Sequence, residues 1–259
     1  MNKPQQSDGT VGKALEILDA VAEVGRPVRF TELLENSPYP KATLYRFLQT
    51  LTNQNMLEYD ELTGTYSMGI RLMRLAHAAW QNASLAPIAR PFIEDLAALV
   101  GETVHLAQLD NGQVLFVDKL RATDRFQTLA QVGQIAPAYC TGVGKAMLAF
   151  IAPKRLQIVL QQQSYFQYTP ATHTSGDSLM QELEVIRAEG IAFDREEHEQ
   201  GINSIAAPIL SQNGRIIGAI SIASATNRFD PAALMQFREP LLETAKKIGE
   251  EATSWQFPS

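Results

Sequence analysis

The segment 40–51 carries the residue types that proteins use to bind a nucleic acid, on one side of an amphipathic helix. Its apolar residues follow the i, i+3, i+4, i+7 spacing of a buried helical stripe: Leu44, Phe47, Leu48 and Leu51. The other side offers two cations for phosphates and three hydrogen-bonding side chains for base edges, namely Lys41, Thr43, Tyr45, Arg46 and Gln49. The spacing predicts a helix, beginning at Pro40, that could lie in the major groove of DNA.

Two further arginines, Arg26 and Arg29, precede this segment in a predicted turn between helices and could hold backbone phosphate. The alternative for the same residues is a helical bundle with an ordinary solvated face. Residues 1–80 contain eight Lys and Arg against nine Asp and Glu, which favours that alternative. The acidic residues of the first helix are nevertheless separate from Lys41 and Arg46, so the opposite charges are segregated.

A glycine-containing turn at 141–144 precedes a predicted helix over 145–150. The unpaired N–H groups at such a turn favour an anion, so Thr141, Gly142 and Val143 could bind a small carboxylate, aided by the Thr141 hydroxyl. A phosphate-binding loop is excluded, because Tyr139 and Ala146 stand where that motif requires Gly and Ser or Thr. Spacing alone favours the alternative, in which the glycines only allow close packing.

Serine hydroxyls interrupt an otherwise apolar strand pattern over 201–224. Ser221 lies two residues from both Ala219 and Ala223, so the three share one face of a strand. If that face is internal, a hydroxyl beside small side chains would provide a cavity with a polar anchor. The alternative is ordinary alternation, with the serines in solvent.

The remaining reactive side chains do not form a recognisable catalytic or metal-binding pattern. Cys140 lacks a histidine at a helpful spacing, so we expect a buried structural thiol rather than a nucleophile. The histidines lack the spacing of a zinc site, and the acidic run 194–199 is expected to be solvated. We therefore expect no metal site and no cofactor.

The elements that must position these residues fall into three parts. Helices over 11–24, 30–36 and from Pro40, followed by strands over 56–59 and 65–68, predict a winged helix-turn-helix within residues 1–69. A helix over 70–82 with one apolar face would link this head to the rest of the chain. Its apolar face could form a dimer contact or pack against its own head.

Residues 83–259 have an α+β pattern. Asn-Gly turns predict two hairpins, 103–109 with 113–120 and 205–210 with 215–223, and Pro208 predicts an edge strand or a bulge. A capping box at 178–181 and a stop at Gly190 delimit one helix, and Asp230-Pro231 begins the C-terminal helix. We expect an antiparallel, curved sheet that is covered on one face and encloses a small ligand.

Composition restricts the class of protein. The chain has 259 residues, 45% of them hydrophobic, a net charge of −6 and one cysteine, which fits one or two globular domains in a reducing compartment. The polar start predicts no signal peptide, and no apolar run is long enough to span a bilayer. These features predict a cytoplasmic protein without a membrane partner.

Several segments together resemble the IclR family of bacterial transcriptional regulators, from Val11 to about Glu251. The most specific segment is GIAFDREEHEQGINSIAAPILSQNGRIIGAISI at 190–222. Supporting segments are YPKATLYRFLQTL, TGTYSMG, GETVHLA and CTGVGKAMLAF. The recognition helix and the acidic segment are similar to those of the KdgR-type branch, which answers to sugar-acid breakdown products.

The resemblance implies a winged-helix head, a linker helix and a GAF/PAS-like effector domain in a homodimer or homotetramer that binds double-stranded operator DNA. It also implies a small organic acid as the effector. Carried over by position, the effector site comprises Thr141, Gly142, Val143, Asp194, Ile202, Ser204, Ser221 and Ala223. Many members have Cys at the position of Ser204 and some have Ser at that of Ala223. Asp194 is expected to accept hydrogen bonds from ligand hydroxyls or to fix the geometry of the pocket.

These observations predict a non-enzymatic, ligand-responsive DNA-binding regulator that acts as a repressor. Two alternatives stay open. One is a small-molecule enzyme built on the C-terminal domain, with Cys140 or the acidic run as catalytic groups. The other is a sensory module whose helical head binds a protein instead of DNA.

Overall fold

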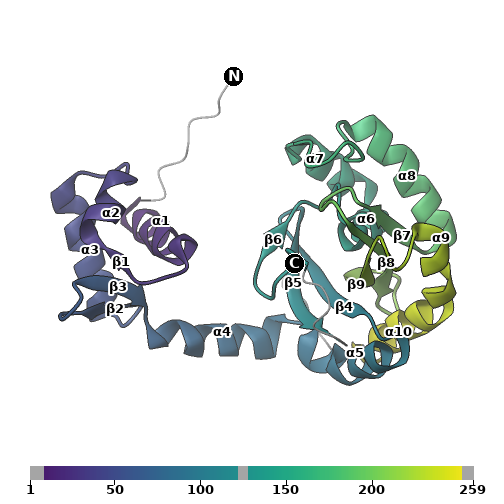
Figure 1. Cartoon of the computed structure of the whole chain (residues 1–259), viewed down its shortest axis with the longest axis horizontal. Helices are drawn as coiled ribbons and strands as arrows, with labels where there is room; N and C mark the ends of the chain where they lie inside the picture. The colour runs from purple at the N-terminus through teal and green to yellow at the C-terminus, as the bar shows by residue number, and fades with distance from the viewer. Residues whose placement is uncertain (1–8, 122–127, 253–259) are drawn as a thin grey trace. The chain divides into compact units, whose positions relative to one another are not determined.

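The structure is a computed structural model that describes residues 9–121 and 128–252. The chain divides into two compact units, with the boundary between Asn82 and Ala83. Each unit has its own hydrophobic core (Figure 1).

The first unit is a three-helix head with a small sheet. Its helices are α1 (Gly9–Val24), α2 (Phe30–Glu35) and α3 (Lys41–Asn53), and its strands are β1 (Val28–Arg29), β2 (Leu57–Asp60) and β3 (Thr65–Met68). The sheet has the order β1-β3-β2, with both pairs antiparallel. The predicted apolar stripe of α3 is buried against α1, at Leu44, Phe47, Leu48 and Leu51. The winged helix-turn-helix is thus confirmed.

Two details of the head differ from the sequence prediction. Pro40 is the N-cap of α3 rather than its first residue, with extended backbone at ψ 148°. The turn before α2 contains the short strand β1, in which Arg29 pairs with Thr65. A two-residue strand has no alternation to detect, so the sequence pattern could not reveal it.

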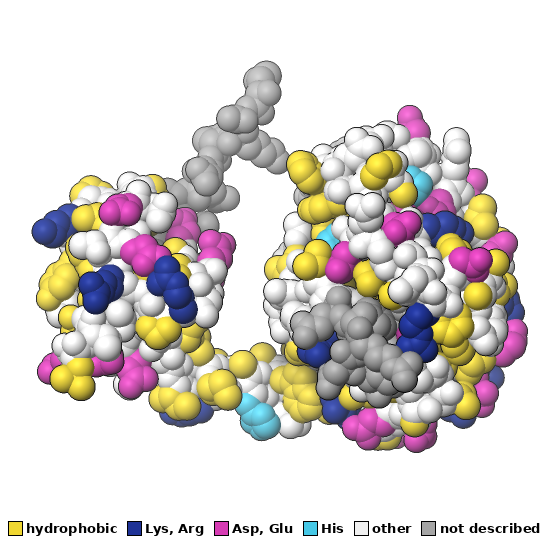
Figure 2. All heavy atoms as spheres, in the orientation of Figure 1, with side chains coloured by type: hydrophobic (Ala, Val, Ile, Leu, Met, Phe, Trp, Pro, Cys, Tyr) yellow, Lys and Arg dark blue, Asp and Glu magenta, His cyan; other side chains and the backbone are white. Residues whose placement is uncertain are grey.

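Helix α4 (Ile70–Ala83) follows the wing and leaves several apolar side chains exposed. Ile70 and Met73 are 71% and 69% exposed, and Leu75 and Trp80 are also accessible. Hydrophobic side chains are visible along α4 in Figure 2. Within this chain the helix therefore does not bury the apolar face that the sequence pattern predicts.

The second unit is built on a six-stranded antiparallel sheet with the order β6-β5-β4-β9-β8-β7. The strands are β4 (Thr103–Asp110), β5 (Gln113–Leu120), β6 (Ile135–Ala136), β7 (Ala192–Arg195), β8 (Ile202–Leu210) and β9 (Ile216–Ala225). Both predicted hairpins form, as β4–β5 and β8–β9.

Helices cover both faces of this sheet, so the prediction of a single covered face is wrong. Helices α5 (Ala86–Val100) and α10 (Arg238–Glu251) share one core with the sheet residues Val104, Ile205 and Ile222. Helices α6 (Gly142–Leu148), α7 (Pro153–Gln162) and α8 (Gly176–Glu189) share the other (Figure 1). Small side chains on that second face, including Ala206 and Ala219, let α6 pack close to β8 and β9.

The helix-end predictions hold in part. Gly190 ends α8 in the left-handed conformation, and Asp230 caps the following turn by accepting from the N–H of Ala233. That turn is the short α9 (Pro231–Leu234), which a 3₁₀ segment separates from α10. The N-cap of α8 is Ser175 rather than Ser178, because the Ser175 hydroxyl accepts from the Ser178 N–H. Both serines precede the same apolar stripe, so spacing alone does not distinguish them.

Pro208 lies in an interior strand, not in an edge strand. Pro208 pairs with Ala219 of β9, whereas the pairing with β7 reaches only as far as Ala206. A register shift follows at Ile209/Leu210. Pro208 has no backbone N–H to donate. Because it lies beyond the end of β7, no hydrogen bond between these two strands is lost.

The contact between α10 and β8 supplies a test of the packing. A Cβ on Gly249 would lie 2.1 Å from the carbonyl oxygen of Leu210. At an open helical site Gly→Ala stabilises by about 1 kcal/mol, whereas here we expect Gly249→Ala to destabilise the second unit by about 1–3 kcal/mol. Urea unfolding followed by circular dichroism measures the change, with Glu251→Ala on the same helix as control. A stabilised Gly249→Ala variant would contradict this packing.

Candidate functional site

The outer side of α3 is available to a partner. Tyr45 is 50% exposed, and the neighbouring polar residues Lys41, Arg46 and Gln49 are also exposed, with Thr43 half-buried. The Gln49 amide donates to the Tyr45 hydroxyl at 3.1 Å, and the Arg46 guanidinium lies 5.6 Å from the centre of the Phe47 ring. Helix α3 contains no Asp or Glu, so its outer side is positively charged.

The two arginines of the preceding turn differ in their surroundings. Arg26 forms an ion pair with Glu32 at 2.6 Å, whereas Arg29 is exposed on β1. An exposed ion pair contributes at most about 1 kcal/mol, so a phosphate could replace Glu32 as the partner of Arg26. Acidic and basic side chains are interspersed elsewhere on the head (Figure 2).

All eight residues singled out for the effector site line one cavity of about 40 Å³ in the second unit. The wall also contains six residues that sequence reasoning did not select: His105, Phe116, Thr128, Ala130, His198 and Glu199. His105 could have been found, because the alternation of β4 places it on the inner face. The residues at 128–130 and 198–199 lie in loops, whose position no periodic pattern gives.

The sheet register brings the polar residues of the cavity together. Asp194 of β7 pairs with Ser204 of β8, and Ser204 pairs with Ala223 of β9. One pair further along, Ser221 lies opposite His105 of β4. Directly opposed residues on neighbouring antiparallel strands have Cβ atoms about 5 Å apart. The strands therefore present these residues side by side on one face.

Gly142 closes the cavity from the helix side. A Cβ on Gly142 would lie 2.8 Å from the Ser204 hydroxyl and 3.3 Å from the backbone nitrogen of Asp194. A glycine is therefore required for the start of α6 to approach β7 and β8 this closely. The packing interpretation of the 141–144 glycines is correct on this point.

The hydroxyl groups of the cavity differ in what they can offer a ligand. The Thr141 hydroxyl donates to the carbonyl of Pro137 at 2.9 Å, so in this arrangement it is free only to accept a further hydrogen bond, and its aid to a ligand carboxylate stays a prediction. Ser204 and Ser221 are buried, and within residues 9–121 and 128–252 their hydroxyls have no hydrogen-bond partner. Both serines line the cavity, so their hydroxyls are free to bond to a bound molecule.

The two cavity histidines are neutral. Burial, assisted by the nearby charge of Lys119, lowers the pKa of His105 to about 3, and burial also lowers the pKa of His198. The His105 Nε2 lies 3.1 Å from the Thr128 hydroxyl. The Lys119 ammonium donates to the Thr128 hydroxyl at 2.9 Å and to the Ala130 carbonyl at 2.6 Å. The side chains of His105, Lys119 and Thr128 therefore have hydrogen-bond partners beside the cavity.

A buried lysine lies behind the helix that closes the cavity. The Lys145 side chain is 0% exposed, and its Nζ lies 2.5 Å from Glu197 and 2.9 Å from Glu182. Glu182 also accepts from His173, and Arg195 lies 3.0 Å from it. Burial acts to raise the pKa of Glu182, but the His173 hydrogen bond and the Lys145 charge outweigh burial and lower it to about 2.

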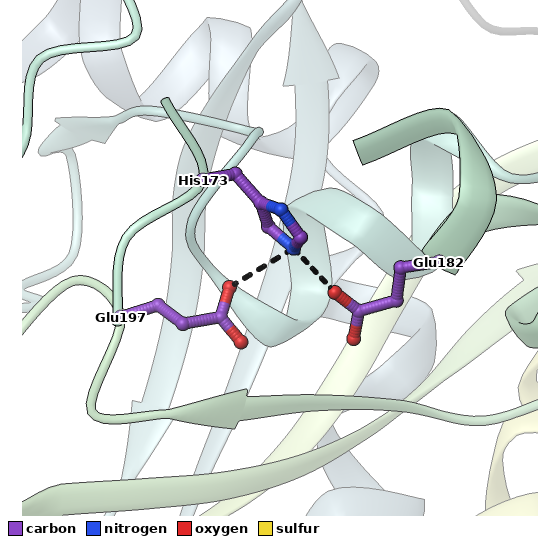
Figure 3. Close-up of side chains that lie close together, drawn as sticks. All are labelled: His173, Glu182 and Glu197. Atoms are coloured by element: carbon purple, nitrogen blue, oxygen red, sulfur yellow. Dashed lines mark hydrogen bonds and ion pairs between the residues drawn. The ribbon is translucent and has the colours of Figure 1, made fainter. Parts of the chain in front are cut away.

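Figure 3 shows His173, Glu182 and Glu197 converging from a loop, from α8 and from the turn after β7. Their ligand atoms lie within 4.8 Å of one another, and nitrogen and carboxylate oxygen are donors that a divalent cation accepts. The Lys145 ammonium already contacts both carboxylates, and Arg195 adds a second positive charge beside Glu182. The prediction that the acidic run 194–199 is solvated is wrong for Asp194 and Glu197, which are buried.

Cys140 is buried with no exposed surface, as predicted. Burial raises the pKa of its thiol, and the carboxylates of Asp194 and Glu197 act in the same direction. A nucleophilic cysteine needs a thiolate, which this environment disfavours.

Comparison with known proteins decides the family. The profile of the IclR helix-turn-helix domain matches residues 10–61, and that of the bacterial transcriptional regulator IclR C-terminal domain matches residues 77–250. The chain belongs to the IclR family. It is thus a DNA-binding transcriptional regulator, as its relatives are.

Two Escherichia coli K12 regulators of the IclR family illustrate the similarity. The chain is 30% identical to the HTH-type transcriptional regulator KdgR over 258 residues, which cover 100% of this chain and 98% of KdgR. It is 30% identical to the regulator XynR over 232 residues, covering 90% and 92%. The resemblance to KdgR-type regulators thus extends over the whole chain.

Solved structures agree with the fold. The Thermotoga maritima IclR structure has a TM-score of 0.77 at 27% identity and covers 94% of this chain and 98% of its own. An IclR homologue from Microbacterium hydrocarbonoxydans, solved in complex with 4-hydroxybenzoate, has a TM-score of 0.80 at 23% identity and covers 94% and 99%. None of the helices in the described part of this chain is long and apolar enough to cross a membrane.

The buried cluster supplies a second prediction. Lys145→Met leaves Glu182 and Glu197 buried without their shared cation, and we expect a loss of about 3–5 kcal/mol in the free energy of unfolding of the second unit. Denaturant unfolding measures the loss. The matched control is Lys154→Met on the exposed side of α7, which should change stability by less than about 0.5 kcal/mol. Equal stability of the two variants would show that the cluster does not hold this unit together.

Proposed function

We propose that this IclR-family regulator is a repressor whose operator binding is modulated by a small organic acid or sugar acid held in the cavity of the second unit. The observation that carries the proposal is the cavity itself. It is lined by all eight residues that the family resemblance assigns to the effector site, and the hydroxyls of Ser204 and Ser221 have no hydrogen-bond partner within the described residues. Free hydroxyls in the wall of a cavity are suited to a ligand that hydrogen-bonds to them.

In this proposal the ligand contacts come from three elements. Thr141, Gly142 and Val143 form the helix side of the site. Asp194 lies on the edge strand, and the sheet contributes Ile202, Ser204, Ser221 and Ala223. Because position 223 is Ala rather than Ser, the ligand of this chain has one hydroxyl fewer to bind than in members with Ser there. The ligand chemistry of those members therefore does not carry over to this chain.

DNA binding is assigned to the exposed side of α3. Lys41, Thr43, Tyr45, Arg46 and Gln49 would contact bases and phosphates, with Arg26 and Arg29 on the backbone. A homodimer would place two α3 helices in major grooves about 34 Å apart on a near-palindromic operator. The exposed apolar residues of α4 support a contact between chains there, in a dimer or within a tetramer.

The size of the cavity supports a small effector. A protein of the same fold binds 4-hydroxybenzoate, which is support from fold analogy for an organic acid. A cavity of about 40 Å³ accommodates a few water molecules. A ligand of few non-hydrogen atoms fits this space with the least rearrangement of the wall.

An enzyme on the second unit is the weaker alternative. Its candidate nucleophile, Cys140, is buried and its thiol has a raised pKa. In the candidate catalytic run, Asp194 and Glu197 are buried, and Glu197 is also bound to Lys145. Turnover of an organic acid that Cys140→Ser abolishes would favour the enzyme. Saturable binding without turnover favours the regulator.

The first test concerns DNA. Arg46→Ala should weaken binding to a DNA fragment from the promoter next to the protein's own gene by about 1–3 kcal/mol, because a charged contact is lost. Gel shifts across a salt series measure both the affinity and its salt dependence. Arg155→Ala, which removes an exposed arginine from α7, is the control and should bind as wild type. Unchanged affinity of Arg46→Ala would remove Arg46 from the contact set.

The second test concerns the effector. In a thermal-shift screen of small organic acids and sugar acids, a true effector raises the melting temperature as occupancy rises. Ser221→Ala should weaken its binding roughly 10- to 100-fold, because a hydrogen bond to a charged group is lost. Ser224→Ala is the matched control, since Ser224 is also buried and unpartnered but belongs to the opposite face of β9. Equal weakening by both substitutions would place the ligand elsewhere.

A further inference from the structure

The cavity contains a carboxyl group whose charge is not balanced by a neighbouring cation. Four buried or half-buried carboxylates lie in the cavity wall or behind it: Asp194 and Glu199 in the wall, and Glu182 and Glu197 behind it. Glu199 accepts from the Leu129 N–H at 2.9 Å. Lys145 contacts Glu182 and Glu197, and Arg195 contacts Glu182. Within residues 9–121 and 128–252, Asp194 has no ion pair and accepts only from backbone, with Glu197 N–H at 2.8 Å from its Oδ1.

The groups that face Asp194 shift the pKa of its carboxyl group in opposite directions. Burial has the largest effect, the charge of Glu197 adds to it, and together they raise the pKa of Asp194 to about 7 from its usual 3.8. The backbone N–H groups of Glu197 and His198 and the Lys145 charge oppose the rise. The described titratable groups around the cavity also include the neutral His105 and His198, Glu199, Cys140 and the Lys119 ammonium. The hydroxyls in the wall are those of Thr128, Thr141, Ser204 and Ser221.

The described wall offers a carboxylate ligand no free cation. Lys145 is shared between its two glutamates, and Lys119 donates to Thr128 and Ala130. The proton of the Thr141 hydroxyl is already donated to Pro137. The free side-chain donors are therefore the hydroxyls of Ser204 and Ser221. An ionised Asp194 in the same cavity would repel the ligand, because like charges in a buried site cannot both stay ionised cheaply.

We propose that the cavity takes up a monocarboxylate effector together with one proton from solvent, which Asp194 holds and donates in a hydrogen bond to the ligand carboxylate. This inference rests on the proposed effector-binding function and names the chemistry by which that site accepts an anion. Asp194 is then a hydrogen-bond donor to the ligand, whereas sequence reasoning expected it to accept from ligand hydroxyls. No bond other than that of the transferred proton forms or breaks.

Proton uptake gives binding a defined pH dependence. With a pKa of about 7, Asp194 in the free protein is mostly protonated at pH 6 and mostly ionised at pH 8. Binding should therefore take up almost no proton at pH 6 and nearly one at pH 8. The dissociation constant should rise about tenfold from pH 6 to pH 8, since the ligand remains ionised across this range.

Isothermal titration calorimetry of the full chain measures both quantities. Glycolate, lactate and gluconate serve as carboxylate probes, and glycolamide and lactamide as uncharged analogues of the first two. Each is titrated at pH 6 and pH 8 in phosphate and in Tris, whose different ionisation enthalpies reveal the protons taken up. Asp194→Asn carries a permanent donor, so it should bind the carboxylate with no proton uptake and with equal affinity at both pH values. Asp95→Asn, on the exposed side of α5, should behave as wild type.

A second measurement needs no ligand. Carboxyl ¹³C NMR of the free protein, with the Asp194 signal assigned by its absence in Asp194→Asn, should show a midpoint near neutral pH. A midpoint below pH 5 would overturn the proposal whatever the probes do, and so would carboxylate binding at pH 8 without proton uptake. Binding of the amides alone would overturn it but leave effector sensing intact. If the NMR midpoint is near neutral and no probe binds, proton storage by Asp194 stands and the choice of a small monocarboxylate as effector is wrong.

Discussion

The burial of one lysine between two glutamates determines how the second unit is assembled. Removing a charged group from water costs several kcal/mol, and the cost is recovered only when its partners are in place. Lys145 belongs to α6, Glu182 to α8 and Glu197 to the turn after β7, so these segments must come together at once. The start of α6 forms one wall of the cavity. The geometry of the site therefore depends on an ion cluster that lies outside it.

The same cluster controls the charge of the cavity. Because Lys145 is held between the two glutamates, its charge is not available to a ligand, and among the described residues Asp194 accepts from backbone donors only. The described side-chain donors of the wall that remain free are the hydroxyls of Ser204 and Ser221. A site of this kind selects ligands by hydrogen-bond geometry and by protonation rather than by a fixed cation. That distinguishes it from an arginine-based anion site, in which the charge of the pocket is independent of pH.

Local patterns in the sequence predicted most of the fold. The stripe of α3, the Asn-Gly hairpins and the Asp230 cap each depend on residues within one turn or one strand pair, where spacing is informative. The family resemblance placed the cavity residues. The Lys145 cluster could not be found this way, because its members come from segments up to 52 residues apart and only tertiary packing joins them. The run 194–199 looked solvated for the same reason, since burial of a charge depends on a distant partner.

The cavity also limits how an effector can be sensed. A ligand changes operator binding only by as much as its affinity differs between the two states of the protein. One side of the cavity consists of β4, β8 and β9, which are paired with one another over most of their length and form a stiff wall. The other side is the start of α6 together with the turn after β7, joined to α8 through Lys145. A displacement of α6 by a ligand would therefore be carried to α8 through the ion cluster.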